Sequence, residues 1–280
     1  MDTTALRQQY ERDGFCLLRG VVSPEELAPV EACIVAGVDA HAQSLHASGK
    51  ITDLHSGEPF DRRLASIYRG RKAGMRMWDE VLSPSALNGL VRSPGVLDGL
   101  EVVLGSDVSF CGDFHLRPKL PDDTLTSFPW HQDSQYYGEQ TQHLHIVTAW
   151  IPLVDVDLDN GCLWVIPGSH RWGLLGGARG DDQNIRTFED VEKRGTPIPV
   201  PMKRGDVLLF TNLTFHASKL NLTQTVRWSM DLRYFATPDC ARLNAKEQDA
   251  LAFFSGKLQA HGRSRNAVRG RDAVQPVLAR

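Results

Sequence analysis

A strict alternation of polar and apolar side chains runs through Thr225-Val226-Arg227-Trp228-Ser229-Met230-Asp231-Leu232-Arg233-Tyr234. Because successive side chains of a strand point to opposite faces of its sheet, this period of two predicts a β-strand. The apolar face carries Val226, Trp228, Met230 and Leu232, and the polar face carries Arg227, Ser229, Asp231 and Arg233. The polar face would either lie on solvent or line a barrel that holds a charged ligand, and the pattern leaves both open.

His216 lies upstream of this segment, shortly after the apolar run Val207-Leu208-Leu209-Phe210, which predicts a buried strand. Arg227 follows His216 by eleven residues. That distance is enough for the chain to turn a hairpin and return, so we expect the two side chains to lie beside each other. A buried guanidinium at this position is suited to bind the carboxylate of a keto acid through two hydrogen bonds.

A second group of polar side chains lies in Trp130-His131-Gln132-Asp133-Ser134. His131 and Asp133 are two residues apart, so in an extended strand both would leave the same face. With His216 they would form a set of two imidazoles and one carboxylate, which leaves metal positions open and is typical of non-haem Fe(II) oxygenases. A single His-x-Asp pair arises by chance in a chain with ten histidines. The prediction therefore depends on His216 and Arg227 as well.

Further short motifs follow one another over roughly residues 7 to 236. They are Tyr10-Glu11-Arg12-Asp13-Gly14-Phe15, Leu17-Leu18-Arg19-Gly20, Arg117-Pro118-Lys119-Leu120-Pro121, Asn160-Gly161-Cys162-Leu163, Ile166-Pro167-Gly168-Ser169-His170, Lys203-Arg204-Gly205-Asp206 and His216-Ala217-Ser218. In this order, together with Pro129–Ser134 and Arg227, the motifs resemble the phytanoyl-CoA dioxygenase-like family of Fe(II)/2-oxoglutarate oxygenases.

The resemblance implies Fe(II), 2-oxoglutarate and O2 as cofactors, with His131, Asp133 and His216 as metal ligands. It implies that Arg227 and Ser218 bind the 5-carboxylate of 2-oxoglutarate. Lys119 matches a family lysine near the cosubstrate, although Leu120 replaces a proline of the family motif. Trp150 resembles a family tryptophan near the cosubstrate, and an ordinary core aromatic is an equal alternative.

The reaction implied is hydroxylation of an unactivated C–H bond of a small molecule, with release of succinate and CO2. The intact Asp133 favours hydroxylation, because related halogenases lack this carboxylate. We expect substrate contacts from Tyr137, Gln132 and Tyr136, which adjoin the metal motif. The basic cluster Arg69, Arg71, Lys72 and Arg76 would meet an anionic substrate or form a solvated helix face.

The order of elements predicts an α+β fold: a double-stranded β-helix, the cupin-like jelly roll, with helices packed on one sheet. We expect one domain over residues 1–280, with helices at about 3–100, the jelly-roll core at about 101–236 and a C-terminal helix and basic tail at about 240–280. Expected helices cover 3–13 and 24 to about Gly37, the latter started by Ser23-Pro24-Glu25-Glu26. Residues 40–62 are expected to be irregular, and 171–197 to form a long insertion, which at this length is typical of a functional lid or a mobile segment.

Composition excludes several other classes of protein. The formal net charge of −3 gives no reason to expect a nucleic-acid partner, and no apolar run is long enough for a membrane span. Five cysteines without a Cys-x-x-Cys pair argue against disulfides or structural zinc and favour a cytoplasmic location. The sequence leaves the substrate and the oligomeric state undetermined.

Two other functions stay open at this point. A cupin-like metal enzyme on the same barrel would act without 2-oxoglutarate and would not need Arg227. A non-catalytic binding module would tolerate the loss of His131. His143 and His145 form a His-x-His pair, but the glutamate of a cupin site is missing after them, so we interpret both as structural or surface residues.

Overall fold

The computed structural model describes residues 2–70, 78–237 and 267–269. The α-helices of this part are α1 (Thr3–Asp13), α2 (Pro24–Ala47), α3 (Arg63–Tyr68), α4 (Pro84–Val91), α5 (Pro94–Leu104) and α6 (Asp133–Tyr137). Short 3-10 helices are η1 (Asp79–Val81), η2 (Thr124–Thr126), η3 (Glu139–His143), η4 (Ser169–Trp172) and η5 (Val191–Lys193).

The strands form three antiparallel sheets. They are β1 (Phe15–Leu18), β2 (Val108–Lys119), β3 (Phe128–His131), β4 (Ile146–Pro152), β5 (Leu163–Val165), β6 (Gly177–Arg179), β7 (Ile185–Thr187), β8 (Ile198–Val200), β9 (Val207–Thr211), β10 (His216–Ser218), β11 (Arg227–Ala236) and β12 (Ala267–Arg269). The large sheet has the order β1-β9-β4-β11-β2-β12, the small sheet has the order β3-β10-β5-β8, and β6 pairs with β7.

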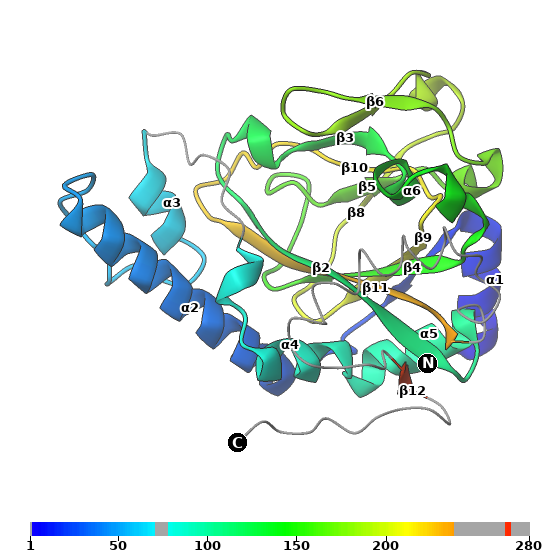
Figure 1. Ribbon diagram of the computed structural model, residues 1–280, viewed down its shortest axis with the longest axis horizontal. Helices are drawn as coiled ribbons and strands as arrows, with labels where there is room; N and C mark the ends of the chain where they lie inside the picture. The colour runs from blue at the N-terminus through cyan, green and yellow to red at the C-terminus, as the bar shows by residue number, and fades with distance from the viewer. Residues whose placement is uncertain (1, 71–77, 238–266, 270–280) are drawn as a thin grey trace.

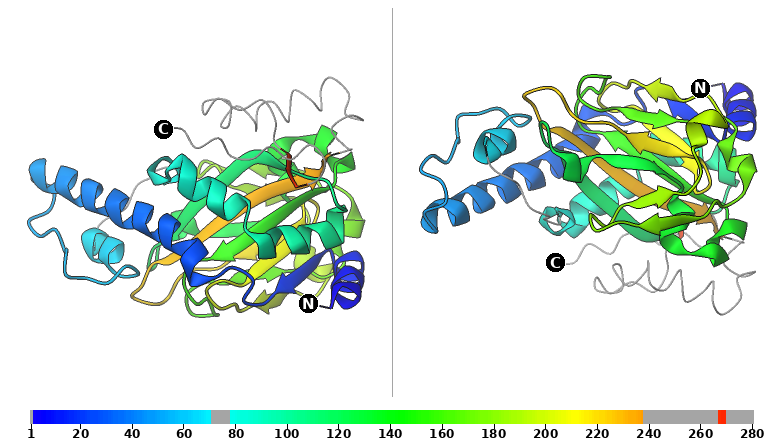
Figure 2. Two further views of the ribbon diagram at one scale, coloured as in Figure 1. Left: turned by 90° about the horizontal axis from the view of Figure 1, so that it is seen from below. Right: turned by 90° about the horizontal axis from the view of Figure 1, so that it is seen from above.

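The two main sheets face each other, and helices cover only one of them (Figure 1). Helices α2, α4 and α5 lie on the outer face of the large sheet, as Figure 2 shows from below. Their apolar side chains join those of the sheet in the main hydrophobic core. The predicted α+β jelly roll with helices on one sheet is confirmed.

Strand β11 separates the helical core from the space between the sheets. Its residues Trp228, Met230, Leu232 and Tyr234 pack in the core with the helices. The alternate residues Arg227, Ser229, Asp231 and Arg233 are also buried, each at most 6% exposed. Since they are not on solvent, the polar face lines the interior of the barrel. Of the two alternatives left by the sequence, the barrel lining is confirmed.

Helix α2 begins as predicted but ends ten residues later than predicted. Ser23 caps the helix in a capping box with Glu26. The helix then continues through Gly37 to Ala47, so the expectation of irregular chain from residue 40 is wrong for this part. Gly37 does not end the helix but allows a close contact, because a Cβ there would lie 2.5 Å from Cγ1 of Val81. A glycine in a helix can thus serve packing instead of termination.

The predicted start of the strands at residue 101 is wrong as well. Residues 94–104 form helix α5, with Pro94 in its first turn and Val96, Leu97 and Leu100 buried. These positions follow a helical period that the apolar composition alone does not distinguish from a buried strand. The first strand of this region is β2, which begins at Val108.

His216 and Arg227 do not belong to one hairpin. His216 lies in β10, which pairs with β3 and β5 in the small sheet. Arg227 begins β11, which pairs with β2 and β4 in the large sheet. The segment between them crosses from one sheet to the other and is held by Asn221, whose side chain donates to the carbonyls of Lys119 and Thr225.

The insertion at 171–197 contains the two-stranded sheet β6–β7 and the helix η5 (Figure 1). The side chains of Tyr136, Gln135 and Asn184 fasten it to the barrel. The predicted helix after residue 240 and most of the basic tail lie outside the described residues, as do Arg71, Lys72 and Arg76.

Candidate metal centre

Three side chains meet at the end of the small sheet. His131 is the last residue of β3, and it pairs directly with His216, the first residue of β10. Asp133 follows at the start of α6. The candidate ligand atoms of the three residues all lie within 4.8 Å of one another, and each residue is at most 6% exposed. Among the described residues this is the only group of three or more that could hold a metal ion.

The prediction that one strand carries both His131 and Asp133 is wrong, although the two side chains do converge. The strand ends at His131, and Gln132 is the extended residue before helix α6. The side-chain amide of Gln132 binds the backbone of two other segments. It donates to the carbonyls of Gly173 and Leu213 and accepts from the N–H of Leu175. These three hydrogen bonds fix the turn that brings Asp133 back to the histidines.

Both histidines have a defined hydrogen bond on Nδ1. Nδ1 of His131 donates to the Pro129 carbonyl at 2.7 Å, and Nδ1 of His216 donates to the Thr214 carbonyl at 3.0 Å. The lone pair of a neutral ring is then on Nε2, the atom left for a metal. Burial lowers the pKa of His216. Burial and the neighbouring His216 together lower the pKa of His131 to about 3. The rings are therefore neutral near pH 7, the form that binds metals.

The two oxygens of Asp133 have different partners. Oδ2 accepts a hydrogen bond from Oγ1 of Thr148 at 2.6 Å, and Nε of Arg233 is 3.6 Å from the same oxygen. Oδ1 lies 3.6 Å from Nε2 of His216, on the side of the cluster. Burial acts to raise the pKa of Asp133, but Arg233 and the histidines outweigh it and lower that pKa. Asp133 thus presents one ionised oxygen to the cluster.

Arg227 lies on the large sheet, across the barrel from His216. It is 3% exposed, and its guanidinium carbon is 5.2 Å from the ring centre of Trp150. Nη1 donates to Oγ of Ser229 at 2.8 Å, while the buried Nε has no partner and no carboxylate of the described residues pairs with the group. Burial lowers the pKa of Arg227 to about 10, so the side chain remains charged near pH 7.

Lys119 is the register partner of Arg227 on β2 and is 1% exposed. Its Nζ donates to the Thr126 carbonyl at 2.6 Å and contacts Oγ of Ser127 at 3.4 Å. Burial, followed by the charge of Arg227, lowers the pKa of Lys119 well below its ordinary value. Two buried basic side chains thus lie side by side, and neither forms an ion pair with an acidic residue in the described part of the chain.

Ser218, at the end of β10, is 4% exposed. Its oxygen accepts from the N–H of Phe128, which leaves its own proton available to a ligand. The structure thus keeps Arg227, Trp150 and Lys119 on the large sheet and Ser218 on the small one. These are the four residues that the sequence assigned to the cosubstrate.

The three residues predicted to contact a substrate have different surroundings. The ring of Tyr136 meets His131 edge-on with centroids 5.3 Å apart, and its oxygen accepts from the N–H of Ile185. Tyr137 instead donates to Oδ2 of Asp113 at 3.0 Å and packs in a small apolar cluster. The side-chain amide of Gln132 binds the backbone of Gly173, Leu175 and Leu213.

Several polar residues around the triad escaped the sequence analysis. Thr148 lies on β4, and Asp113 lies on β2 within 3.4 Å of Nε of Arg233. The sequence does indicate the position of Arg233 and Asp231, since both fall on the polar face of the alternating segment. Thr148 and Asp113 stand in mostly apolar segments, where the sequence gives no sign of their partners.

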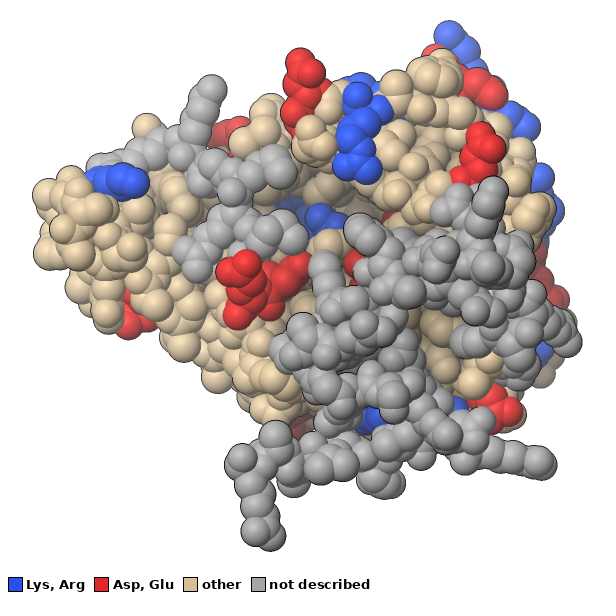
Figure 3. Space-filling model, in the orientation of Figure 1, with Lys and Arg blue, Asp and Glu red and all other residues tan. Residues whose placement is uncertain are grey.

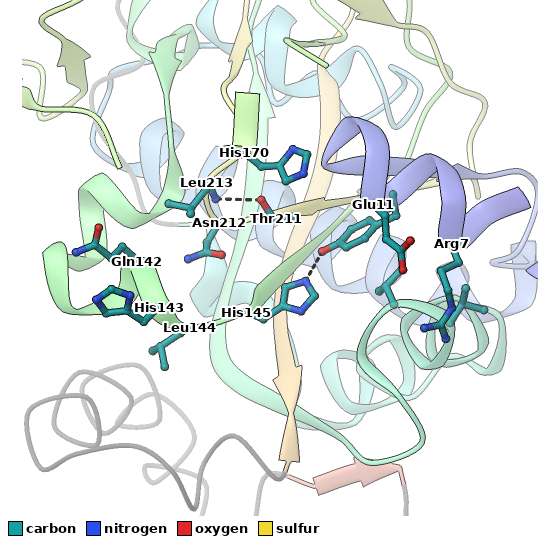
Figure 4. Close-up of a pocket in the computed structure, with 13 residues that line it drawn as sticks. Arg7, Glu11, Gln142, His143, Leu144, His145, His170, Thr211, Asn212 and Leu213 are labelled. Carbon is teal, nitrogen blue, oxygen red and sulfur yellow. Dashed lines mark hydrogen bonds between the residues drawn. The ribbon is translucent and has the colours of Figure 1, made fainter. Parts of the chain in front are cut away.

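Three other histidines, His143, His145 and His170, line a separate pocket of about 410 Å³ between α1, α5 and the chain before β4 (Figure 4). Nε2 of His145 shares a hydrogen bond with the hydroxyl of Tyr10 at 2.9 Å. This contact ties the start of β4 to α1. Since the pocket does not include the triad, we treat these histidines apart from the metal centre.

Comparison with known proteins decides the family. The family model described as phytanoyl-CoA dioxygenase (PhyH) matches residues 10–229. The chain belongs to the phytanoyl-CoA dioxygenase family. Members of this family are oxygenases that use Fe(II), 2-oxoglutarate and O2, and this chain is therefore an Fe(II)/2-oxoglutarate-dependent dioxygenase.

Individual PhyH-family relatives extend over most of the chain. The peroxisomal phytanoyl-CoA dioxygenase of Mus musculus is 31% identical over 85% of this chain and 69% of its own length. The 1-deoxypentalenic acid 11-beta-hydroxylase of Streptomyces arenae is 29% identical over 83% of this chain and 81% of its own length. The solved structure of the non-heme monooxygenase ThoJ shares the fold, with 22% identity, a TM-score of 0.56 and coverage of 82% of this chain and 77% of that one.

The donor set fits the cofactors of the PhyH family. Two neutral imidazoles and one carboxylate on one side of a metal leave positions for a keto acid and O2, as Fe(II) oxygenases require. The buried, acid-free guanidinium of Arg227 fits the far carboxylate of 2-oxoglutarate. Within the described residues, no helix has the length and apolar composition needed to cross a bilayer.

Proposed function

We propose that this chain hydroxylates an unactivated C–H bond of a small-molecule substrate and converts 2-oxoglutarate to succinate and CO2. Membership of the PhyH family supports oxygenase activity. The similarity to the 1-deoxypentalenic acid 11-beta-hydroxylase supports hydroxylation as its outcome. The carboxylate of Asp133 supports hydroxylation too, since it would fill a metal position that halogenases of this type leave open.

In this proposal His131 and His216 hold Fe(II) through Nε2, and Asp133 holds it through Oδ1. Thr148 and Arg233 keep the second oxygen of Asp133 engaged, so that the carboxylate presents one atom to the metal. When bound, Fe(II) with O2 and 2-oxoglutarate supplies the oxidising chemistry. The protein fixes the geometry and keeps water from the site through the burial of all three ligands.

The observation that carries the proposal is the buried guanidinium of Arg227, which pairs with no acidic residue in the described part of the chain. Leaving such a charge unpaired is costly, and a ligand carboxylate removes the cost. We assign the 5-carboxylate of 2-oxoglutarate to Arg227 and the free proton of Ser218. Lys119 adds a second positive charge, and Trp150 holds the guanidinium plane of Arg227.

Among the substrate contacts, Tyr136 has the best support because its ring lies against His131. Tyr137 and Gln132 remain predictions, since their polar atoms already bind Asp113 and the backbone. A metal enzyme that does not use 2-oxoglutarate would not need Arg227 and Lys119, two buried basic side chains that form no ion pair with an acid among the described residues.

The test is an anaerobic titration of the protein with Fe(II) and 2-oxoglutarate. We expect a weak metal-to-ligand charge-transfer band in the visible, and release of succinate once O2 is admitted. In Arg227→Ala the band should need at least tenfold more 2-oxoglutarate. Arg204→Ala is the matched control, because Arg204 is a partly buried arginine that pairs with Glu31 of helix α2, away from the metal ligands. Absence of both the band and succinate in the wild-type protein would refute the proposal.

A further inference from the structure

One basic side chain between the sheets leaves most of its hydrogen-bonding capacity unused. Arg117 lies on β2, where its register partner is Ser229 of β11. Its side chain is 32% exposed, whereas the side chain of Arg233 is 7% exposed. Arg117 is thus an interior cation that reaches the opening of the barrel. Figure 3 shows basic side chains inside and above a hollow on this face of the molecule.

The guanidinium of Arg117 is held in a fixed orientation. Nε donates to Oδ1 of Asp231 at 3.0 Å, and the group lies over the ring of Phe128 with 4.8 Å between the guanidinium carbon and the ring centre. The other oxygen of Asp231 is 2.6 Å from Nη1 of Arg233. Asp231 is therefore occupied on both oxygens, and Nη1 and Nη2 of Arg117 have no acceptor among the described residues.

Arg117 adjoins the cosubstrate residues, since it lies two residues before Lys119 on β2 and opposite Ser229, which accepts a hydrogen bond from Arg227. It spans from the large sheet to Phe128 on β3, three residues before His131. A group bound to the free edge of this guanidinium would therefore lie near both the strand that ends at His131 and the cosubstrate residues.

A second cation flanks the same opening. Arg179, on β6, places its guanidinium carbon 5.4 Å from the ring centre of Tyr136. The same ring meets His131 edge-on. Arg179 is exposed, and its acceptor among the described residues is the Gln183 carbonyl at 3.5 Å. No carboxylate of the described residues pairs with it.

We propose that the substrate is an acidic small molecule whose carboxylate binds Nη1 and Nη2 of Arg117, with Arg179 adding positive charge at the mouth. The planar edge of a guanidinium matches a carboxylate with two parallel hydrogen bonds. A purely hydrocarbon substrate would cover this edge without offering an acceptor, which is unfavourable. This inference rests on the proposed hydroxylase and adds the class of its substrate.

The experiment measures succinate release by the Fe(II)-loaded protein with matched pairs of compounds. The probes are linear, branched and cyclic monocarboxylic acids of four to twelve carbons, each paired with its primary amide. We expect at least one acid to accelerate succinate release over the uncoupled rate, and its amide to be at least tenfold less effective. In Arg117→Gln this discrimination should fall below threefold, and Arg117→Lys should retain part of it.

Two controls separate this role from others. Arg204→Gln removes an equally exposed positive charge that pairs with Glu31 of helix α2, on the outer side of the large sheet, and should keep the wild-type discrimination. The 2-oxoglutarate concentration at half-maximal charge-transfer band should change less than threefold in Arg117→Gln, and the unfolding temperature shows whether each variant is folded.

Three results would overturn the inference: amides as effective as acids, no acid that accelerates succinate release, or a tenfold loss of 2-oxoglutarate binding in Arg117→Gln. The last would assign Arg117 to the cosubstrate. Failure of the proposed hydroxylase looks different, since the wild-type protein would then give neither the band nor succinate.

Discussion

His131 and His216 are direct register partners across the β3–β10 pair, with ring centroids 4.2 Å apart. Side chains on opposite residues of an antiparallel pair are natural neighbours. Two ligands that are 85 positions apart in the sequence (216 − 131) are therefore brought together by ordinary strand pairing. Only Asp133 needs a special device, which is the turn held by Gln132.

His216→Ala should weaken Fe(II) binding by at least about 100-fold, because it removes one of three ligands and outer partners alone account for about 10- to 100-fold. Anaerobic calorimetry with Fe(II) measures the effect. His143→Ala is the control, since His143 is exposed and outside the triad. Unchanged Fe(II) affinity in His216→Ala would remove this residue from the metal site.

Thr148→Val should lower Fe(II) affinity by about 10- to 100-fold, since Oδ2 of Asp133 loses its hydroxyl donor. The buried control Thr141→Val makes the same change away from the ligands, where the hydroxyl donates to the Gly138 carbonyl. Both variants should lose stability in urea denaturation, but only the first should lose metal affinity. Equal affinities would show that Thr148 has no part in positioning the carboxylate.

Lys119→Met should stabilise the protein free of 2-oxoglutarate by on the order of 1 kcal/mol near pH 7, because a buried cation is replaced by an apolar chain of similar size. The same change should weaken 2-oxoglutarate binding. Urea denaturation and titration of the charge-transfer band measure the two effects. A variant that loses both stability and cosubstrate affinity would contradict this account of Lys119.

The stabilisation by Lys119→Met should depend on pH. Burial lowers the folded-state pKa of Lys119, so between that value and about 10.5 the unfolded chain binds more protons at this residue. The wild-type protein therefore gains stability from this residue as the pH rises, and the advantage of the variant should shrink toward pH 10. Lys203→Met, a surface control, should not show this trend, since Lys203 is 78% exposed and its pairing with Asp155 raises its pKa instead of lowering it.

Gln132→Leu should lower the free energy of unfolding by on the order of 3 kcal/mol, because two carbonyls and one N–H lose their partner in the interior. Gln142→Leu on the exposed η3 should have little effect. Urea denaturation compares the two. If Gln132→Leu is as stable as the wild type but alters the response to substrate, the original prediction of a substrate contact holds instead.

The sequence predicts best where one local rule decides the structure. The alternation through Arg227 predicts both the strand and its polar inner face, and the capping box at Ser23 predicts the start of α2. The chemistry of the side chains predicts the metal ligands, the resemblance to the family predicts the cosubstrate residues, and the structure brings the triad together.

The sequence fails where long-range packing decides. Gly37 continues a helix because Val81, far along the chain, packs against it. The path from His216 to Arg227 crosses between sheets, and nothing local distinguishes that crossing from a hairpin. Asp133 reaches the histidines through a turn held by the backbone of residues 173–175 and 213, which no spacing within 130–134 reveals.

The alternation in β11 also restricts how enzymes of this design can diverge. A shift of the strand by one residue would exchange Arg227 with Trp228 and turn every inward polar group into the helical core. The register of β11 is thus fixed both by its apolar face and by its polar face. New substrate preferences must arise from replacing single inward side chains such as Arg117, or from the segments that surround the mouth, and not from sliding the barrel wall.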